Sequence, residues 1–180
     1  MKSDLPIRKP TRLKGYDYST FGAYFITICV KDRKQLLSEI IVGDGVLDVP
    51  HSILTSYGVI AEKYIIQMNE FYDNISVDKY VVMPNHIHMI LSVIPRLDEC
   101  LENGTSRTPS PTNSMVAKFV SAFKRFCNKE YGENIWQRSY HDHIIRGERD
   151  YEKIWEYIDT NVIKWEEDCF YNEKGHSDLL

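Results

Sequence analysis

The stretch VVMPNHIHMIL, residues 81–91, constrains the fold more than any other part of the sequence. It is apolar and rich in β-branched residues, which is typical of a buried strand, yet it carries two histidines two residues apart. Residues i and i+2 of a strand lie on the same face, so we expect His86 and His88 to project together. The alternation places Val82 and Ile90 on this histidine face. It places Val81, Met83, Ile87, Met89 and Leu91 on the opposite face, which should be core.

Other patterns predict that strands and helices alternate along the chain. Strands are expected at 23–33, in a long segment 75–94 bent at Pro84, and in 134–146, and a Gly-Asp-Gly sequence at 43–45 predicts a hairpin turn. Apolar residues at helical spacing predict helices over 52–72, 114–126 and 148–165. These elements offer too few crossovers for a doubly wound parallel sheet. The sequence therefore predicts an α+β fold with helices packed on an antiparallel sheet.

The length of 180 residues suits a single domain. We expect a basic N-terminal arm over 1–20, one catalytic α+β domain over 21–168 and a C-terminal tail over 169–180. The segment 98–114 is rich in Ser, Thr, Pro and Asn and is interpreted as a flexible loop, because neither side of it could easily fold alone.

Charge and cysteine content narrow the class of protein. The net charge of −4 excludes a global basic field, but the N-terminal arm is basic, and an exposed basic arm can hold phosphates. The four cysteines lie far apart without a CxxC pair, which argues against a zinc ribbon or a disulfide framework and fits a reducing compartment. No apolar signal core and no run of membrane-spanning length occurs, so we expect a cytoplasmic protein that does not contact a membrane.

The histidine pair has two interpretations. Two neutral imidazoles side by side are a common metal half-site, and the alternative is a hydrogen-bonded pair buried under a helix. A second pair, His141 and His143, has the same spacing, and spacing alone does not rank the two. The context favours His86 and His88, since an unpaired polar group is costly in so apolar a strand.

A metal needs at least a third ligand, and the last helix offers one. Asn161 falls at the edge of the buried stripe of this helix, and Tyr157 lies one turn earlier on the same edge. Both side chains could point into a cleft. The alternative is that Tyr157 only packs at the boundary of helix and sheet, with its hydroxyl in water.

Four segments together resemble the REP-associated tyrosine transposases, within the wider class of single-stranded DNA transposases that carry a His-hydrophobic-His motif. They are KGYDYSTFGAYFITICVKDR, VVMPNHIHMIL, IWQRSYHDHIIR and the helix from Tyr157 to Asn161 with Lys-Trp after it, in the same order over residues 8–166. The resemblance implies a ferredoxin-like domain, with His86-Ile87-His88 as the motif, Tyr157 as the nucleophile and Asn161 as the third metal ligand. Relatives often read Asn-Pro where this chain has Asn161-Val162, a change that should lengthen the helix.

The activity implied by this resemblance is DNA transposition, a form of recombination. The enzyme would be an endonuclease and strand transferase that cleaves and rejoins hairpin-bearing single-stranded DNA through a 5′-phosphotyrosine, which conserves the bond energy for rejoining. Two imidazoles and an amide oxygen are compatible with Mg²⁺ or Mn²⁺, and no small-molecule cofactor is implied. Both a monomer and a homodimer remain open, because the family contains both.

Basic residues interleave with aromatic ones in the arm and around Trp136, a pattern suited to phosphate contact and base stacking. The candidate DNA-binding residues are Arg12, Lys14, Arg138, His143 and Arg146. Two further hypotheses are a non-catalytic single-stranded DNA-binding remnant of the fold and a metal-dependent phosphodiesterase that uses water. The intact motif positions weigh against the remnant. The lack of an acidic cluster or third histidine near the pair weighs against an ordinary zinc hydrolase.

Overall fold

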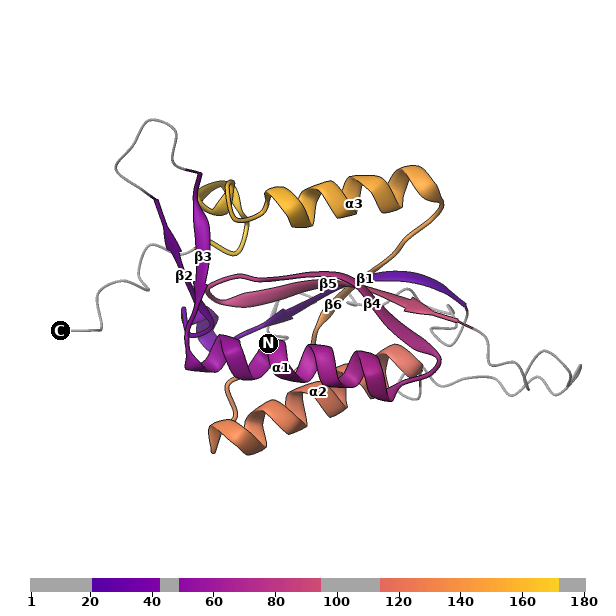
Figure 1. The fold of residues 1–180 in the computed structure, drawn as a ribbon, viewed down its shortest axis with the longest axis horizontal. Helices are drawn as coiled ribbons and strands as arrows, with labels where there is room; N and C mark the ends of the chain where they lie inside the picture. The colour runs from indigo at the N-terminus through magenta and orange to yellow at the C-terminus, as the bar shows by residue number, and fades with distance from the viewer. Residues whose placement is uncertain (1–20, 43–48, 95–113, 172–180) are drawn as a thin grey trace, which may run out of the picture.

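The computed structural model describes residues 21–42, 49–94 and 114–171 (Figure 1). Its elements are β1 (Gly22–Cys29), β2 (Ser38–Ile41), β3 (His51–Leu54), α1 (Ser56–Phe71), β4 (Ile75–Val82), β5 (His86–Val93), α2 (Met115–Tyr131), β6 (His141–Ile144) and α3 (Glu148–Thr160). The expected arm with Arg12 and Lys14, the expected turn at 43–45 and nearly all of the loop 98–114 lie outside the described residues.

Four strands form one antiparallel sheet in the order β4-β5-β1-β6, and β2 pairs with β3 in a separate antiparallel ribbon. Apart from this ribbon, the order of elements is β1-α1-β4-β5-α2-β6, which with this strand order is the ferredoxin-like topology. Helices α1 and α2 cover one face of the sheet and α3 covers the other (Figure 1). The predicted α+β fold with helices on an antiparallel sheet is confirmed.

The core lies between the sheet and the layer of α1 and α2. Alternate residues of the central strands and one face of α2 fill it, and all are at most 1% exposed: Tyr24, Ile26 and Ile28, then Ile87, Met89 and Leu91, then Val116, Phe119, Val120 and Phe123. Burying one such side chain contributes roughly 1.5–3 kcal/mol. The period of two then turns the residues between them, among them Thr27 and His88, toward α3.

The segment 75–94 is a hairpin and not one bent strand, so this prediction is wrong. β4 and β5 meet at a turn that contains Pro84, where the Met83 N–H donates to His86 O at 2.9 Å. Proline is suited to the turn because it has no N–H for the ladder. The turn also interrupts the alternation: Val81 pairs with His88 and Val82 with Ile87. Val81 therefore lies on the histidine face and Val82 on the core face, the reverse of the prediction.

Three further boundaries differ from the prediction. The first residues of the expected helix 52–72 pair with β2, and α1 begins only after its N-cap Thr55. The expected strand 134–146 contracts to the four residues of β6. Helix α3 ends at Thr160 with Asn161 as its C-cap, so the replacement of proline by Val162 does not lengthen the helix.

Two polar contacts hold helix α3 to β4. The Tyr151 hydroxyl donates to Asp78 Oδ2 at 3.1 Å, and Lys79 forms an ion pair with Asp159. The Lys79 ammonium also lies 4.7 Å from the Trp155 ring centre. These contacts set where the C-terminal turns of α3 lie over the sheet.

No helix in the described part of the chain is long and apolar enough to cross a membrane.

The first turn of α1 contacts the backbone before β2 so closely that only glycine fits. A Cβ at Gly58 would lie 2.0 Å from Leu37 O. We expect Gly58→Ala to lower the free energy of unfolding by about 2 kcal/mol, because overpacking of about 1–3 kcal/mol exceeds the helix propensity gained. Chemical denaturation measures the change. Val59→Ala, at a half-exposed neighbouring position, is the control, and a Gly58→Ala protein as stable as this control would contradict the prediction.

Candidate metal and tyrosine site

The two histidines of β5 are buried under α3, with His86 0% and His88 1% exposed. Their Nε2 atoms lie 2.9 Å apart. Each Nδ1 atom has a partner on the far side of its ring: Asn85 Oδ1 lies 2.9 Å from His86 Nδ1, and Thr27 Oγ1 lies 2.9 Å from His88 Nδ1. These partners orient both rings so that their Nε2 atoms point at one place.

The Asn85 amide determines which nitrogen of His86 carries the proton. Its Nδ2 donates to Phe170 O at 2.8 Å and to Arg33 O at 3.4 Å, which leaves Oδ1 as an acceptor facing His86. His86 Nδ1 is therefore the donor, and its Nε2 presents a lone pair. Burial lowers the pKa of His86 well below 6.5, and the charges of His88 and Arg33 add to the effect. Burial also lowers the pKa of His88, against the opposing pull of Asp168. Both rings are neutral at pH 7, which is the form that binds metals.

Tyr157 and Asn161 reach the same place from α3. The Tyr157 oxygen lies 3.2 Å from His88 Nε2, and its hydroxyl donates to Asp168 Oδ2 at 2.9 Å. Asn161 Nδ2 donates to the same oxygen at 2.9 Å. The other amide atom, Asn161 Oδ1, is buried without a hydrogen-bond partner among the described residues. The structure thus brings together the four residues that the sequence singled out for chemistry.

Asp168 completes this cluster, and sequence reasoning missed it. Ligand atoms of His86, His88 and Asp168 lie within 4.8 Å of one another, and this group could hold a metal ion. The Asp168 side chain is 1% exposed, and its Oδ1 accepts the Phe170 N–H at 2.7 Å. The sequence shows no acidic cluster or third histidine near the pair, but the fold brings one carboxylate there from a distant segment. Asp168 follows the end of α3, where helical periodicity has no predictive value, and it stands in a run of acids that looks like solvated surface.

The charge of Asp168 suits a cation site. Burial opposes ionisation of this carboxyl, but the His88 ring, the Phe170 N–H and the Asn161 amide outweigh it and hold its pKa well below 3.8. Two imidazole nitrogens, a carboxylate oxygen and an unpartnered amide oxygen form a mixed donor set that fits a divalent cation. The unpartnered Asn161 Oδ1 is the observation that most favours this fit, since a buried acceptor left alone is costly.

The phenol of Tyr157 is protonated in this environment. Burial raises its pKa above 10, and the hydrogen bond to Asp168 raises it further, because a nearby carboxylate disfavours a phenolate. The side chain is still 39% exposed. The oxygen of Tyr157 is therefore held at the histidines on one side and is open to an incoming molecule on the other.

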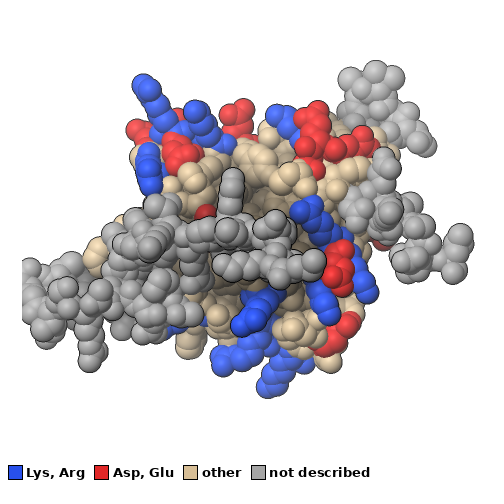
Figure 2. Space-filling view, turned by 180° about the vertical axis from the view of Figure 1, so that it is seen from behind, with Lys and Arg blue, Asp and Glu red and all other residues tan. Residues whose placement is uncertain are grey.

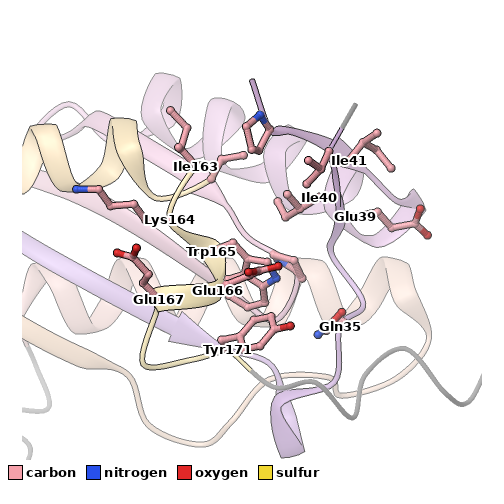
Figure 3. Close-up of a pocket in the computed structure, with 14 residues that line it drawn as sticks. Gln35, Glu39, Ile40, Ile41, Ile163, Lys164, Trp165, Glu166, Glu167 and Tyr171 are labelled. Carbon is pink, nitrogen blue, oxygen red and sulfur yellow. The ribbon is translucent and has the colours of Figure 1, made fainter. Parts of the chain in front are cut away.

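One small cleft adjoins the site, and a larger one lies next to it. The small one, of about 140 Å³, is lined by Tyr157, Asn161 and Asp168, together with Thr160, Lys164 and Glu167. The larger one, of about 560 Å³, lies between the β2–β3 ribbon and residues 162–171 and shares Lys164 and Glu167 with the first. Figure 3 shows Trp165 and Glu166 pointing into the larger cleft, with Gln35 and Tyr171 at one end.

The expected DNA-binding residues that the structure describes lie at the surface beyond this cluster. Arg138 and Arg146 are exposed, and exposed His143 pairs with Asp150 at 2.9 Å. His141 pairs in register with Thr27 on the histidine face and lies 6.2 Å from the Phe170 ring centre, but it is exposed and outside the metal-binding group. Basic side chains gather over the start of α3, where acids lie among them, and over α2 (Figure 2).

Comparison with known proteins finds relatives of this chain. No protein-family model matches the chain. An uncharacterized protein of Haemophilus influenzae is 33% identical over 177 residues, which cover 91% of this chain and 93% of that protein. The chain belongs to the same family as that protein. A candidate REP-associated tyrosine transposase of the same organism is 24% identical over 149 residues, which cover 82% of this chain and 74% of that protein.

The fold is also similar to that of a solved transposase structure. The structure of a REP-associated tyrosine transposase bound to a REP hairpin aligns with a TM-score of 0.55 and 21% identity, and the match covers 89% of this chain and 74% of that one. At this identity the match shows a shared fold. Together with the weak sequence similarity, it supports the predicted resemblance at the level of the superfamily.

The donor set yields a prediction about metal binding. His88→Ala and Asp168→Ala should each weaken Mn²⁺ binding by more than about tenfold. Each variant removes an atom that would bind the metal itself, and not a residue that only orients such an atom. Titration calorimetry with Mn²⁺ measures the affinity. His141→Ala is the matched control, because it removes an imidazole with the same spacing outside the cluster. Equal weakening by His141→Ala would show that the wrong pair had been chosen.

Proposed function

We propose that the protein is a metal-dependent tyrosine transposase that cleaves and rejoins hairpin-bearing single-stranded DNA. The observation that carries this proposal is the position of the Tyr157 oxygen, 3.2 Å from His88 Nε2 and 2.9 Å from Asp168 Oδ2. A tyrosine that only packed would have no reason to place its hydroxyl on a potential metal ligand. The fold shared with a transposase bound to a REP hairpin supports stem-loop DNA as the substrate class.

The protein's own groups account for one round of cleavage. Tyr157 Oη attacks the phosphorus in line, the P–O3′ bond breaks, and the departing 3′-oxygen takes up a proton from solvent to become a hydroxyl. Asp168 Oδ2 already accepts the phenol's hydrogen bond and is placed to take its proton. The strand remains attached through a 5′-phosphotyrosine, and the reverse attack by a 3′-hydroxyl rejoins it. The reversible bond is what separates strand transfer from hydrolysis.

A bound Mg²⁺ or Mn²⁺ would neutralise a non-bridging phosphate oxygen and favour the phenolate form of Tyr157. His86 and His88 would hold it with their Nε2 atoms, and Asp168 or Asn161 would supply the third ligand. Asn85 and Thr27 keep the two rings turned toward the site. The small cleft at Tyr157 and the larger cleft that shares Lys164 and Glu167 with it offer aromatic and apolar surface for unpaired bases.

Contacts to the rest of the strand are proposed for the basic residues predicted from the sequence. Arg138, His143 and Arg146 are exposed on or near β6, beside the face that carries the histidines. Arg12 and Lys14 belong to the N-terminal arm and complete this set. The chemistry requires one copy of each site residue, so the proposal holds for a monomer and for a homodimer.

The sharpest test removes one oxygen atom. Tyr157→Phe should leave the fold and DNA binding nearly unchanged but eliminate strand cleavage and the covalent protein–DNA adduct together. Labelled hairpin-bearing single strands, incubated with Mn²⁺ and separated on a denaturing gel, measure both products. Tyr151→Phe, on the same helix, should keep both. Retention of the adduct by Tyr157→Phe would rule out this tyrosine as the nucleophile.

A second candidate function follows from Asp168. A His-His-carboxylate group could also hold a cation that activates water, and the protein would then be a phosphodiesterase in which Tyr157 only packs. The same gel separates the two functions. A water-using enzyme would cleave equally well as Tyr157→Phe and form no adduct with either protein.

The substrate class gives a further prediction. The protein should bind single-stranded DNA with a stem-loop more tightly than blunt duplex of the same length, with affinity falling as salt rises. Fluorescence anisotropy over a range of salt concentrations measures both effects. Equal affinity for a random duplex would contradict the proposed substrate.

A further inference from the structure

Arg33 lies beside the candidate site although it is far from it in sequence. It belongs to a 3-10 turn, Lys31–Arg33, that follows β1 after Val30. Its guanidinium carbon lies 5.0 Å from the Phe170 ring centre, and that ring lies 4.6 Å from the His86 ring centre. One aromatic ring therefore separates a positive charge from the histidine pair.

Among the described residues, the guanidinium donates one hydrogen bond. Nη1 donates to Cys169 O at 2.7 Å, and no carboxylate of the described residues lies within ion-pair distance. An arginine carries five N–H donors in a planar fork. The side chain is only partly exposed, so this charge is not simply left in water. Its unused donors fit a phosphate, which such a fork binds through paired, charge-assisted hydrogen bonds.

The backbone holds Arg33 at some cost. Asp32 and Arg33 adopt φ of 57° and 56°, a left-handed conformation that residues other than glycine rarely adopt in succession. Such strain persists where the surroundings determine it, often at functional sites. Here Arg33 N–H donates to Val30 O at 3.2 Å, and Asn85 Nδ2 donates to Arg33 O at 3.4 Å. The amide that orients His86 thus also positions the arginine.

We propose that Arg33 and the ring of Phe170 form a phosphate-binding subsite for the DNA strand next to the cleavage site. The proposal rests on the proposed function and adds a contact to it. The Phe170 ring keeps the guanidinium away from the histidine centre, so the phosphate bound is a neighbour of the one that Tyr157 attacks. Arg33 holds the strand in register and takes no part in bond making.

The salt dependence of binding tests this contact. Each phosphate neutralised on a single strand contributes about 0.7 to the slope of log affinity against log salt. The probe is a fluorescent stem-loop oligonucleotide with single-stranded flanks, and the Tyr157→Phe background prevents its cleavage. In this background Arg33→Gln should reduce the magnitude of the slope by about 0.7. Lys129→Gln removes one charge from the end of α2, on the other face of the sheet, and should keep the parent slope.

A second measurement separates phosphate binding from support of the chain near Asp168. Arg33→Gln should bind Mn²⁺ as the parent does, because it removes none of the proposed ligands. Loss of Mn²⁺ affinity would show that Arg33 acts by holding residues 168–171, and an unchanged salt slope would exclude the phosphate contact. Either result overturns this inference alone. Failure of the parent protein to bind the oligonucleotide would instead overturn the proposed function.

Discussion

Two imidazole rings buried in one strand face each other with their Nε2 atoms 2.9 Å apart, and the remaining site is arranged around this contact. Burial lowers the pKa of both rings and favours their neutral forms, and the Asn85 oxygen beside Nδ1 leaves the Nε2 of His86 with a lone pair at the point where the rings meet. Such a contact is unfavourable in an apolar layer unless something satisfies it. Asn85 and Thr27 satisfy the outer nitrogens and leave the inner ones available. A divalent cation between the rings would satisfy those, which is why we interpret the pair as half of a metal site.

The other half comes from chain segments that the fold brings to the histidines. Tyr151 and Lys79 hold α3 to β4, and Tyr157 near the end of the helix contacts His88 of β5. The chain then leaves the helix and folds back, which places Asp168 against both Tyr157 and Asn161. One oxygen of Asp168 thus accepts hydrogen bonds from both the proposed nucleophile, Tyr157, and a proposed metal ligand, Asn161. Sheet, helix and the segment after the helix each contribute, so the site depends on the ferredoxin-like layering and not on one local motif.

Much of this could be predicted from sequence, and the failures have physical causes. Strand periodicity correctly put His86 and His88 on one face, and helical spacing put Tyr157 and Asn161 on one edge, because both patterns depend only on local geometry. The reversal of Val81 and Val82 followed from reading through the turn at Pro84, where alternation stops. The sequence did not predict Asp168 and Arg33 as site residues, because both lie in irregular segments. Their approach to the site depends on tertiary hydrogen bonds from the Asn85 amide to Phe170 O and to Arg33 O, which no periodicity encodes.

A transposase of the proposed kind would attach Tyr157 covalently to DNA at the histidine pair. The most direct measurement is peptide mapping by mass spectrometry of the adduct trapped with a labelled stem-loop strand and Mn²⁺. We predict a single modified peptide, from α3, with the 5′-phosphate on Tyr157. DNA attached to any other residue, or efficient cleavage that leaves no attached DNA, would contradict the account.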